Sequence, residues 1–225
     1  MRKILDLIAK KKFSIVISLP KNDLALAKAA FESKIDALKV HLNVEHKASG
    51  TFFGSWQQEK EVIAQIIDAA NVPIGLMPGT LSQMITSQEL NEAKELGIDF
   101  VDCYDYDTPL WLYQTKITKM IALGKDFTFK DLRSLNDLNI DLIEASIIKP
   151  ENYGQELTVK DIELYQSIVK SAKLPVFIPS QKKIKPEHLK VLKQIGVKGV
   201  LLGVISLGNT VDSFRENIEK FVDAI

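Results

Sequence analysis

The sequence predicts an α/β fold, a (β/α)8 TIM barrel with an extra N-terminal helix, and three observations support this prediction. Eight short apolar runs alternate along the chain with segments of helical periodicity. The 225 residues give roughly 28 residues for each strand–helix unit, slightly fewer than is typical of such barrels. The even-numbered runs also share a residue pattern, which is expected when alternate strands contribute to common interior layers.

Strands are expected where short apolar runs, or a strict alternation of apolar and polar residues, suit β-structure. The second run alternates without a break from Ala37 to His46, so its polar side chains share one face. A solvated surface hairpin is the alternative interpretation of this run. The expected strands are Phe13–Leu19, Ala37–Val44, Val72–Met77, Phe100–Tyr104, Lys116–Ala122, Leu142–Ile147, Val176–Pro179 and Gly199–Val204.

Helices are expected where apolar residues recur with helical spacing, in some cases after a start signal. Thr158 stands at an N-cap position and Pro186 at a first-turn position. The connection Asp105–Gln114 is long enough for at most one helical turn. The expected helices are Arg2–Lys12, which is the extra N-terminal helix, and Asp23–Glu32, Gln57–Ala70, Ser87–Leu96, Phe129–Leu138, Val159–Ala172, Pro186–Ile195 and Val211–Ala224.

No break in composition and no low-complexity linker interrupts residues 1–225, so a single domain is expected. An open doubly wound sheet is the alternative architecture. No glycine fingerprint follows the first expected strand, which leaves the usual dinucleotide-binding version of that sheet without support.

An internal repeat predicts which side chains face the interior of the barrel. The segments Ile35–Lys39, Ile98–Asp102 and Ile140–Glu144 each read Ile-Asp, two apolar residues and a charge, and Val197–Leu201 is a weaker copy. If these segments begin alternate strands, their equivalent residues share layers. One layer would then hold Lys39, Asp102, Glu144 and Leu201, and the next layer toward the C-terminal mouth would hold His41, Tyr104, Ser146 and Gly203.

The charge and cysteine content narrow the class of protein. Lys+Arg and Asp+Glu balance at 29 each, so neither nucleic acid nor a membrane surface is an expected partner. The single cysteine, Cys103, excludes an intrachain disulfide and a multi-cysteine zinc site. The N-terminal residues lack the apolar core of a signal peptide, and no apolar run approaches the roughly 20 residues that span a bilayer. We therefore expect a cytoplasmic protein.

Lys39, Asp102, Glu144 and His41 are the candidate catalytic residues. Inside a barrel a carboxylate can remove a proton next to a carbonyl, and an ammonium can stabilise the resulting enolate. A lysine of lowered pKa could instead form a Schiff base, and a purely structural ion-pair network is the third alternative. His41 could polarise an oxygen or relay a proton, or it could be a hydrogen-bonded structural residue.

Further polar residues near strand ends are candidates for contacts with a substrate. Lys119 lies on a strand whose facing is not determined, Asp105 could be a turn former, and Lys149 could be solvated. The three histidines show no metal-ligand spacing, so neither a metal nor another cofactor is expected. The substrate-binding candidates are Ser18, Asn43, Tyr104, Asp105, Lys119, Ser146 and Lys149.

The loops after the seventh and eighth strands often bind phosphate in such barrels, through backbone N–H groups and a helix N-terminus. Here the first loop contains no glycine, and an ordinary basic turn with a helix cap is the alternative. The phosphate-binding candidates are Ser180, Gln181, Lys182, Gly203, Val204 and Gly208.

The long segment Glu45–Trp56 follows the second strand and carries Phe52 and Phe53. It could form a lid over the mouth, with Gly50 and Gly54 as hinges. Trp111, in the fourth connection, could join such a lid. Contacts within a homodimer are the alternative use of these aromatic side chains.

Several of these segments together resemble the ribulose-phosphate-binding group of TIM barrels, and within it the N-acetylmannosamine-6-phosphate 2-epimerase family. Ile15–Pro20 is similar to that family's first strand and its Leu-Pro turn, and Ala37–Lys39 to its second strand. Phe100–Asp105 resembles a fourth strand that contacts the sugar, and Leu174–Gly203 resembles the phosphate-binding end. However, Val72–Pro78 lacks the lysine that the family uses for catalysis.

The resemblance implies an isomerase or epimerase of carbohydrate metabolism that acts by proton transfer on a small phosphorylated sugar or related phosphometabolite. A Schiff-base aldolase or lyase is one alternative. A non-catalytic barrel that binds a phosphometabolite is the other, because fold-level analogy does not decide the reaction.

Overall fold

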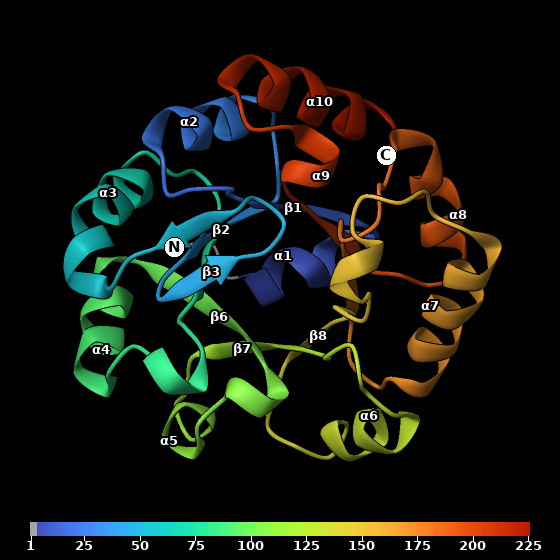
Figure 1. Cartoon of the computed structure of the whole chain (residues 1–225), viewed down its shortest axis with the longest axis horizontal. Helices are drawn as coiled ribbons and strands as arrows, with labels where there is room; N and C mark the ends of the chain where they lie inside the picture. Colours follow the sequence, from blue (N-terminus) through green and yellow to red (C-terminus); the bar gives the residue numbers. More distant parts are fainter. Residues whose placement is uncertain (1–3) are drawn as a thin grey trace.

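Eight parallel strands close into a barrel in the order β1-β10-β9-β8-β7-β6-β5-β2, and helices surround it (Figure 1). The computed structural model describes residues 4–225. The barrel strands are β1 (Ser14–Ser18), β2 (Ala37–His41), β5 (Ile74–Met77), β6 (Ile98–Tyr104), β7 (Thr118–Ala122), β8 (Leu142–Glu144), β9 (Val176–Pro179) and β10 (Gly199–Leu202). The predicted (β/α)8 barrel is confirmed.

The helices lie close to their predicted positions, because most begin at a capping residue that the local sequence supplies. At α4, α6, α7 and α10 the N-cap is a threonine whose side chain accepts a backbone N–H from the first turn. The α-helices around the barrel are α2 (Leu24–Glu32), α3 (Trp56–Asp68), α4 (Ser87–Leu96), α5 (Leu110–Tyr113), α6 (Phe129–Leu135), α7 (Val159–Ser171), α8 (Leu189–Gln194), α9 (Val204–Leu207) and α10 (Val211–Asp223). Short 3₁₀ turns are η1 (Leu81–Gln83), η2 (Asp105–Asp107), η3 (Pro150–Asn152) and η4 (Pro186–His188).

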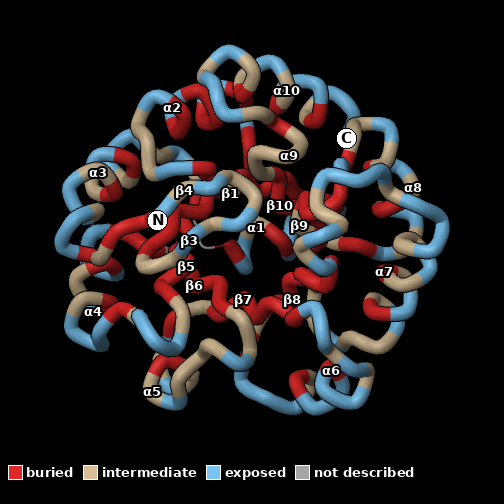
Figure 2. The backbone as a smooth tube through the Cα atoms, in the orientation of Figure 1, coloured by how far each residue is buried: buried red, intermediate tan, exposed pale blue. Residues whose placement is uncertain are grey.

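Every barrel strand except β5 divides its apolar side chains between two cores, because successive residues point to opposite faces. Outward residues such as Leu38 and Val40 pack in one core together with residues of the surrounding helices. Figure 2 shows that the buried backbone follows the strands and the inner sides of those helices. A second, smaller core, here called the inner cluster, contains Ile4, Ile8, Val16, Ala37, Phe100, Met120, Leu142, Phe177 and Leu201.

Two glycines allow large aromatic side chains to fill the barrel interior. A Cβ atom at Gly75 would lie 2.2 Å from the ring of Phe100, and one at Gly199 would lie 2.4 Å from the ring of Phe177. Both phenylalanines are fully buried in the inner cluster. The absence of a side chain on the neighbouring strand therefore makes the space that each ring occupies.

The N-terminal helix α1 (Ile4–Lys10) closes the N-terminal end of the barrel. Figure 1 shows it inside the ring of strands rather than outside. Its buried residues Ile4 and Ile8 belong to the inner cluster, and the Ile4 backbone N–H donates to Asp99 Oδ2 at 2.6 Å. The predicted extra helix is therefore present, although it ends at Lys10 rather than Lys12, and Arg2 and Lys3 of the expected span lie outside the described residues.

The aspartates of the Ile-Asp repeat fasten this end of the barrel. Asp36 Oδ2 accepts the backbone N–H of Ile15 at 2.9 Å, and Asp141 Oδ2 accepts that of Lys119 at 2.8 Å. Asp99 binds α1 in the same way. Each carboxylate thus satisfies a backbone donor at the start of a neighbouring element, which gives the aspartate of the repeat a structural role.

The second strand ends earlier than predicted, and the expected strand Ala37–Val44 is wrong in its last residues. The chain leaves the barrel at Asn43, whose φ of 52° lies in the left-handed region. It then forms an antiparallel hairpin of β3 (Val44–His46) and β4 (Thr51–Phe53). The alternation of apolar and polar residues continues through β3, so the sequence pattern does not show that the barrel strand ends before Asn43. The last expected strand is also shorter, because Val204 begins α9.

No helix in the described part of the chain combines the length and apolar character that a membrane crossing needs.

We predict that Ile8→Ala lowers the free energy of unfolding by about 2–5 kcal/mol, the usual cost of a large-to-small change in a core. Leu5→Ala provides a matched control on the more exposed side of the same helix, and it should cost well under half as much. Denaturant unfolding of both variants measures the difference. Equal losses would show that α1 does not fill the barrel end.

Candidate active site

A cavity of about 480 Å³ opens at the C-terminal mouth of the barrel. This is the end at which barrel enzymes carry their active sites. Residues from the strand ends and the following loops line it, so side chains far apart in the sequence meet there. The cavity is lined by these sequence-predicted residues: Ser18, Lys39, His41, Asp102, Tyr104, Glu144, Ser146, Ser180, Gln181, Gly203 and Val204.

A buried ion-pair cluster forms the charged part of this cavity. Lys39 Nζ lies 2.6 Å from Asp102 Oδ2 and 3.2 Å from Glu144 Oε2. The three residues come from β2, β6 and β8, and all are buried. The structure therefore brings them together as the repeat predicts. Leu201, expected in the same layer, also lines the cavity but packs in the inner cluster.

One ammonium faces two carboxyl groups in this cluster, so its single positive charge cannot balance two negative charges. The pKa values of all three groups are shifted as a result. Burial opposes the charge of Lys39, but Asp102 and Glu144 outweigh it and raise the pKa of the ammonium above its usual range. Burial, together with repulsion from Glu144, raises the pKa of Asp102 well above its ordinary value. The pKa of Glu144 is lowered because Lys39 and hydrogen bonds outweigh its burial. These opposite shifts make Asp102 the carboxyl group of the pair that binds a proton more readily.

His41 lies beside the cluster as a neutral imidazole. Burial, with His46 and Lys39 adding to it, lowers the pKa of His41 well below its usual value. Its Nε2 lies 3.3 Å from Ser18 Oγ, and its buried Nδ1 has no hydrogen-bond partner among the described residues. The side chain of Asn22 bonds to both the N–H and the C=O of His41 and fixes the backbone there.

A hydrogen-bonded chain of side chains forms one wall of the cavity. The Tyr104 hydroxyl lies 2.9 Å from Ser146 Oγ. Gln181 Nε2 donates to Ser146 Oγ and to the Tyr153 hydroxyl, each at 2.8 Å. Gln181 Oε1 accepts the backbone N–H of Ile148 at 3.0 Å. Gln181 is therefore held by the wall, and its amide is not free for the phosphate contact expected from the sequence.

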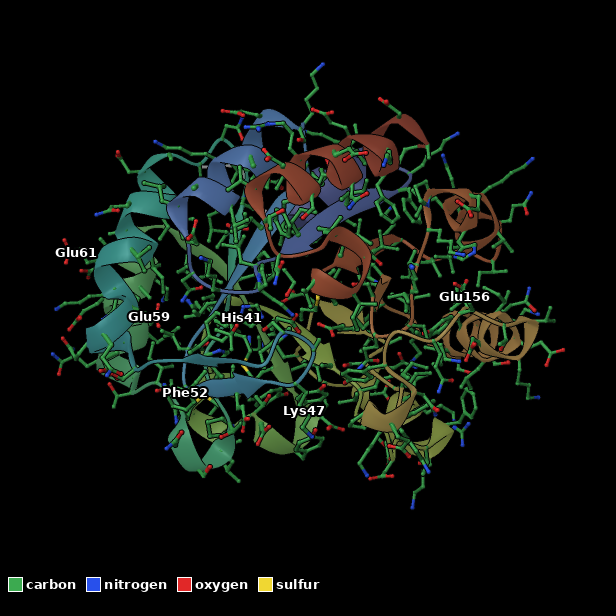
Figure 3. All side chains as sticks on the ribbon, turned by 45° about the horizontal axis from the view of Figure 1, so that its top comes forward. His41, Lys47, Phe52, Glu59, Glu61 and Glu156 are labelled. Carbon is green, nitrogen blue, oxygen red and sulfur yellow. The ribbon has the colours of Figure 1, made fainter. Side chains whose placement is uncertain are left out.

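The β3–β4 hairpin lies over the mouth of the barrel (Figure 1). The ring of Phe53 lies 4.7 Å from that of His41, and the ring of His46 lies 5.2 Å from it. Lys47, at the hairpin turn, also lines the cavity. Figure 3 shows His41 next to the hairpin segment that carries Lys47 and Phe52.

The aromatic residues expected in a lid have different positions. Phe53 covers His41, whereas Phe52 is 67% exposed. Trp56 is the first residue of α3 and is buried, with its Nε1 donating to Glu92 Oε2 at 2.9 Å. Trp111 packs against the core between the strands and the surrounding helices, and it does not line the cavity. The hairpin covers the mouth, but neither tryptophan belongs to that cover.

Two lysines that the sequence proposed for ligand contacts are directed elsewhere. Lys119 lies on the outward face of β7, and its Nζ donates to the carbonyl oxygens of Thr115 at 2.8 Å and Ile117 at 3.0 Å. Lys182 forms an ion pair with Asp161 of α7 at 3.1 Å. Neither lysine lines the cavity. Sequence reasoning could not find their partners, because those partners depend on how the loops and helices pack.

Four further candidates also lie outside the lining of the cavity. Asn43 makes the left-handed break after β2. Asp105 lies in the turn η2, where its Oδ1 accepts the N–H of Tyr106 at 2.8 Å. Lys149 is exposed before η3, and Gly208 ends α9 with a φ of 82°. Asn43, Asp105 and Gly208 therefore have local structural roles, whereas Lys149 is exposed to solvent.

The cavity also contains residues that the sequence analysis did not select. Tyr153, Tyr106, His46 and Lys125 line it from loops after β8, β6, β2 and β7. Their positions after predicted strands could have identified them, because the loop that follows every barrel strand reaches the mouth. Cys103 lines the cavity as well, but burial raises the pKa of its thiol to about 12, which leaves it an inert thiol at neutral pH.

The expected phosphate-binding end is only partly available for a ligand. Ser180 Oγ accepts the backbone N–H of Gly203 at 2.8 Å, so this N–H is already used. Val204 and Ile205, the first residues of α9, line the cavity. The first N–H groups of a helix have no partner within the helix.

The described residues contain no group of three or more His, Cys, Asp or Glu side chains suited to a metal ion.

No family model and no curated protein sequence matches the chain. Solved structures do match it. Thiamine phosphate pyrophosphorylase from Pyrococcus furiosus has a TM-score of 0.66 at 12% identity, with 95% of each chain covered. A tryptophan synthase α-subunit from the same organism has a TM-score of 0.71 at 15% identity, over 93% of this chain and 98% of that one.

A protein from Aquifex aeolicus VF5 has a TM-score of 0.71 at 13% identity, over 100% of this chain and 99% of that one. At identities this low, these likenesses show that the chain shares the (β/α)8 barrel fold. The resemblance to the epimerase family remains a hypothesis.

We predict that Lys39→Met destabilises the protein by about 3–5 kcal/mol near pH 8, because it leaves two buried carboxyl groups without a cation. In the variant their folded-state pKa values rise above those of the unfolded chain, near 4. Stability is then retained below about pH 4 and lost as the pH rises. Denaturant unfolding at several pH values measures this slope. Lys125→Met, in an exposed ion pair with Asp126, is the control, and a loss independent of pH would contradict the prediction.

A second prediction concerns His46, whose pKa is lowered to about 4, first by burial and then by the charge of Lys39. Because the unfolded pKa is near 6.5, neutral His46 contributes stability above that pH and loses it as the pH falls toward 4. His46→Gln should therefore reduce the acid-side slope of stability. An NMR titration of the imidazole measures the pKa directly, and a midpoint near 6.5 would show that the hairpin does not bury His46.

Proposed function

We propose that the protein is an enzyme that transfers a proton within a small phosphorylated sugar or related phosphometabolite, as an isomerase or epimerase. The observation that carries the proposal is the buried contact of Lys39 with both Asp102 and Glu144 in the cavity at the barrel mouth. Such a site combines two carboxyl groups whose pKa values are shifted in opposite directions with a fixed positive charge. These are the groups that proton transfer next to a carbonyl requires.

The proposed roles follow the directions of the pKa shifts, in which Glu144 is the carboxyl group that ionises more readily. The Glu144 carboxylate takes the proton from the carbon next to the substrate carbonyl, and the electron pair of that C–H bond moves to form an enolate. The Lys39 ammonium stabilises the enolate oxygen in a site where burial strengthens the interaction. Protonation of a carbon by Asp102 or Glu144 then completes an isomerisation or an epimerisation. Neutral His41 is suited to pass a proton between substrate oxygens.

The phosphate group of the substrate is assigned to the end of the cavity formed by Ser180, Gly203 and Val204. The Ser180 hydroxyl and the first N–H groups of α9 are the donors available there. A neighbour in fold is named as a thiamine phosphate enzyme, which is consistent with a phosphorylated ligand for this chain as well.

The aldolase alternative requires a lysine amine that is neutral near physiological pH. The carboxyl groups around Lys39 act in the opposite direction, because they raise the pKa of its ammonium. Proton transfer is therefore the better use of this lysine. Borohydride should trap no substrate on it.

A non-catalytic phosphometabolite-binding barrel is the second candidate, and one observation favours it. Val72–Pro78 carries no lysine where the epimerase family has its catalytic one, so this chain lacks a group that the family's reaction uses. This candidate predicts ligand binding without exchange of the ligand's carbon-bound hydrogen.

The proposal is tested with inorganic phosphate, dihydroxyacetone phosphate, pentose phosphates and hexose phosphates, each sugar also without its phosphate. Thermal shift measures binding, and NMR in D₂O measures incorporation of deuterium. Wild type should exchange hydrogen with at least one phosphorylated sugar, and Asp102→Asn or Glu144→Gln should slow the exchange about 10²–10⁴-fold. Glu163→Gln changes an exposed carboxylate of α7 and is the control. Binding without any exchange would favour the non-catalytic alternative.

A further inference from the structure

The amide of Gln181 has a fixed orientation in the cavity wall. The backbone N–H of Ile148 can only donate, so the Gln181 atom that faces it must be the oxygen. The amide nitrogen therefore faces Ser146 and Tyr153, and both of its hydrogens are donated to their hydroxyl oxygens. Gln181 is 7% exposed and has no hydrogen left for a ligand.

The Ser146 hydroxyl also has its hydrogen-bond partners within the wall. It accepts from Gln181 and shares a hydrogen bond of 2.9 Å with the Tyr104 hydroxyl, in which either oxygen can be the donor. Ser146 also helps to lower the pKa of the Glu144 carboxyl group. One hydrogen of the Tyr104–Ser146 pair is therefore held between the two hydroxyl oxygens.

The hydrogen of the Tyr153 hydroxyl is uncommitted, because its hydrogen-bond partner among the described residues is the donating amide of Gln181. Its hydroxyl accepts from Gln181 at 2.8 Å and donates to no other described residue. Burial raises its pKa, so the hydroxyl remains protonated at neutral pH. The side chain is half-buried and lines the cavity that also contains Glu144. A tyrosine held by an amide in this way is a donor with a fixed direction.

We infer that Tyr153 donates a hydrogen bond to the enolate oxygen of the substrate, and that Gln181 is the residue that positions it. This inference rests on the proposed function and adds to it a second donor besides Lys39. It also defines the substrate class more closely, as a phosphorylated hydroxy-carbonyl compound whose carbonyl oxygen gains negative charge during proton transfer. A donor aimed at that oxygen acts mainly in the transition state.

The test measures deuterium exchange into whichever pentose, hexose or dihydroxyacetone phosphate the wild type exchanges. Tyr153→Phe removes only the hydroxyl, and it should lower kcat about 10²–10³-fold with KM nearly unchanged, as loss of one oxyanion donor does. In Gln181→Glu the carboxylate can only accept, so Tyr153 would turn its hydrogen toward it. That variant should lose a similar factor in kcat, and the double variant should be no slower than either single one.

Tyr113→Phe is the matched control, because the Tyr113 hydroxyl accepts a backbone N–H from Asn139 away from the cavity. It should exchange at the wild-type rate, and thermal unfolding of all variants shows that they are folded. Wild-type kcat in Tyr153→Phe, or a rise in KM alone, would overturn the inference and leave the proposed function standing. If the wild type exchanges no sugar phosphate of the panel, the proposed function fails and the inference fails with it.

Discussion

The contact of one lysine with two carboxyl groups inside the barrel is the interaction on which the rest of the site depends. Lys39, Asp102 and Glu144 are contributed by strands that are far apart in the sequence, and only closure of the barrel brings their charged atoms within hydrogen-bonding distance. Buried charges are costly unless they are paired. The cluster therefore requires the closed barrel, and the contacts within the closed barrel in turn shift the pKa of each group.

The two ends of the barrel interior differ, because one is filled with apolar side chains and the other holds the charged cavity. Near the N-terminal end, Phe100, Phe177 and the residues of α1 fill the space with apolar atoms. At the other end the cavity and the hairpin surround the ion-pair cluster. Water can reach the charges only from the mouth, so electrostatic interactions there are stronger than they would be in solvent. The apolar packing of one end thus contributes to the chemistry of the other.

The wall of the cavity shows how a neutral side chain can organise charged and polar ones. Gln181 is anchored by a backbone N–H, and its two hydrogens set the directions in which Ser146 and Tyr153 can donate. One of these hydroxyls supports the ionised state of Glu144, and the other faces the space for a ligand. A residue expected to contact phosphate therefore has its effect through its neighbours.

The sequence by itself predicted the barrel and the inward-facing charges Lys39, Asp102 and Glu144. Both follow from local periodicity, since alternate residues of a strand must face opposite sides, and the repeat marked which alternation faced inward. The tertiary structure decided where other side chains of similar type are directed. Lys182 meets Asp161, Lys119 meets two carbonyl groups, and Asn43 breaks a pattern that alternates past it. The physical reason is that a flexible polar side chain takes the partner that packing places nearest, and in these cases the fold selects that partner.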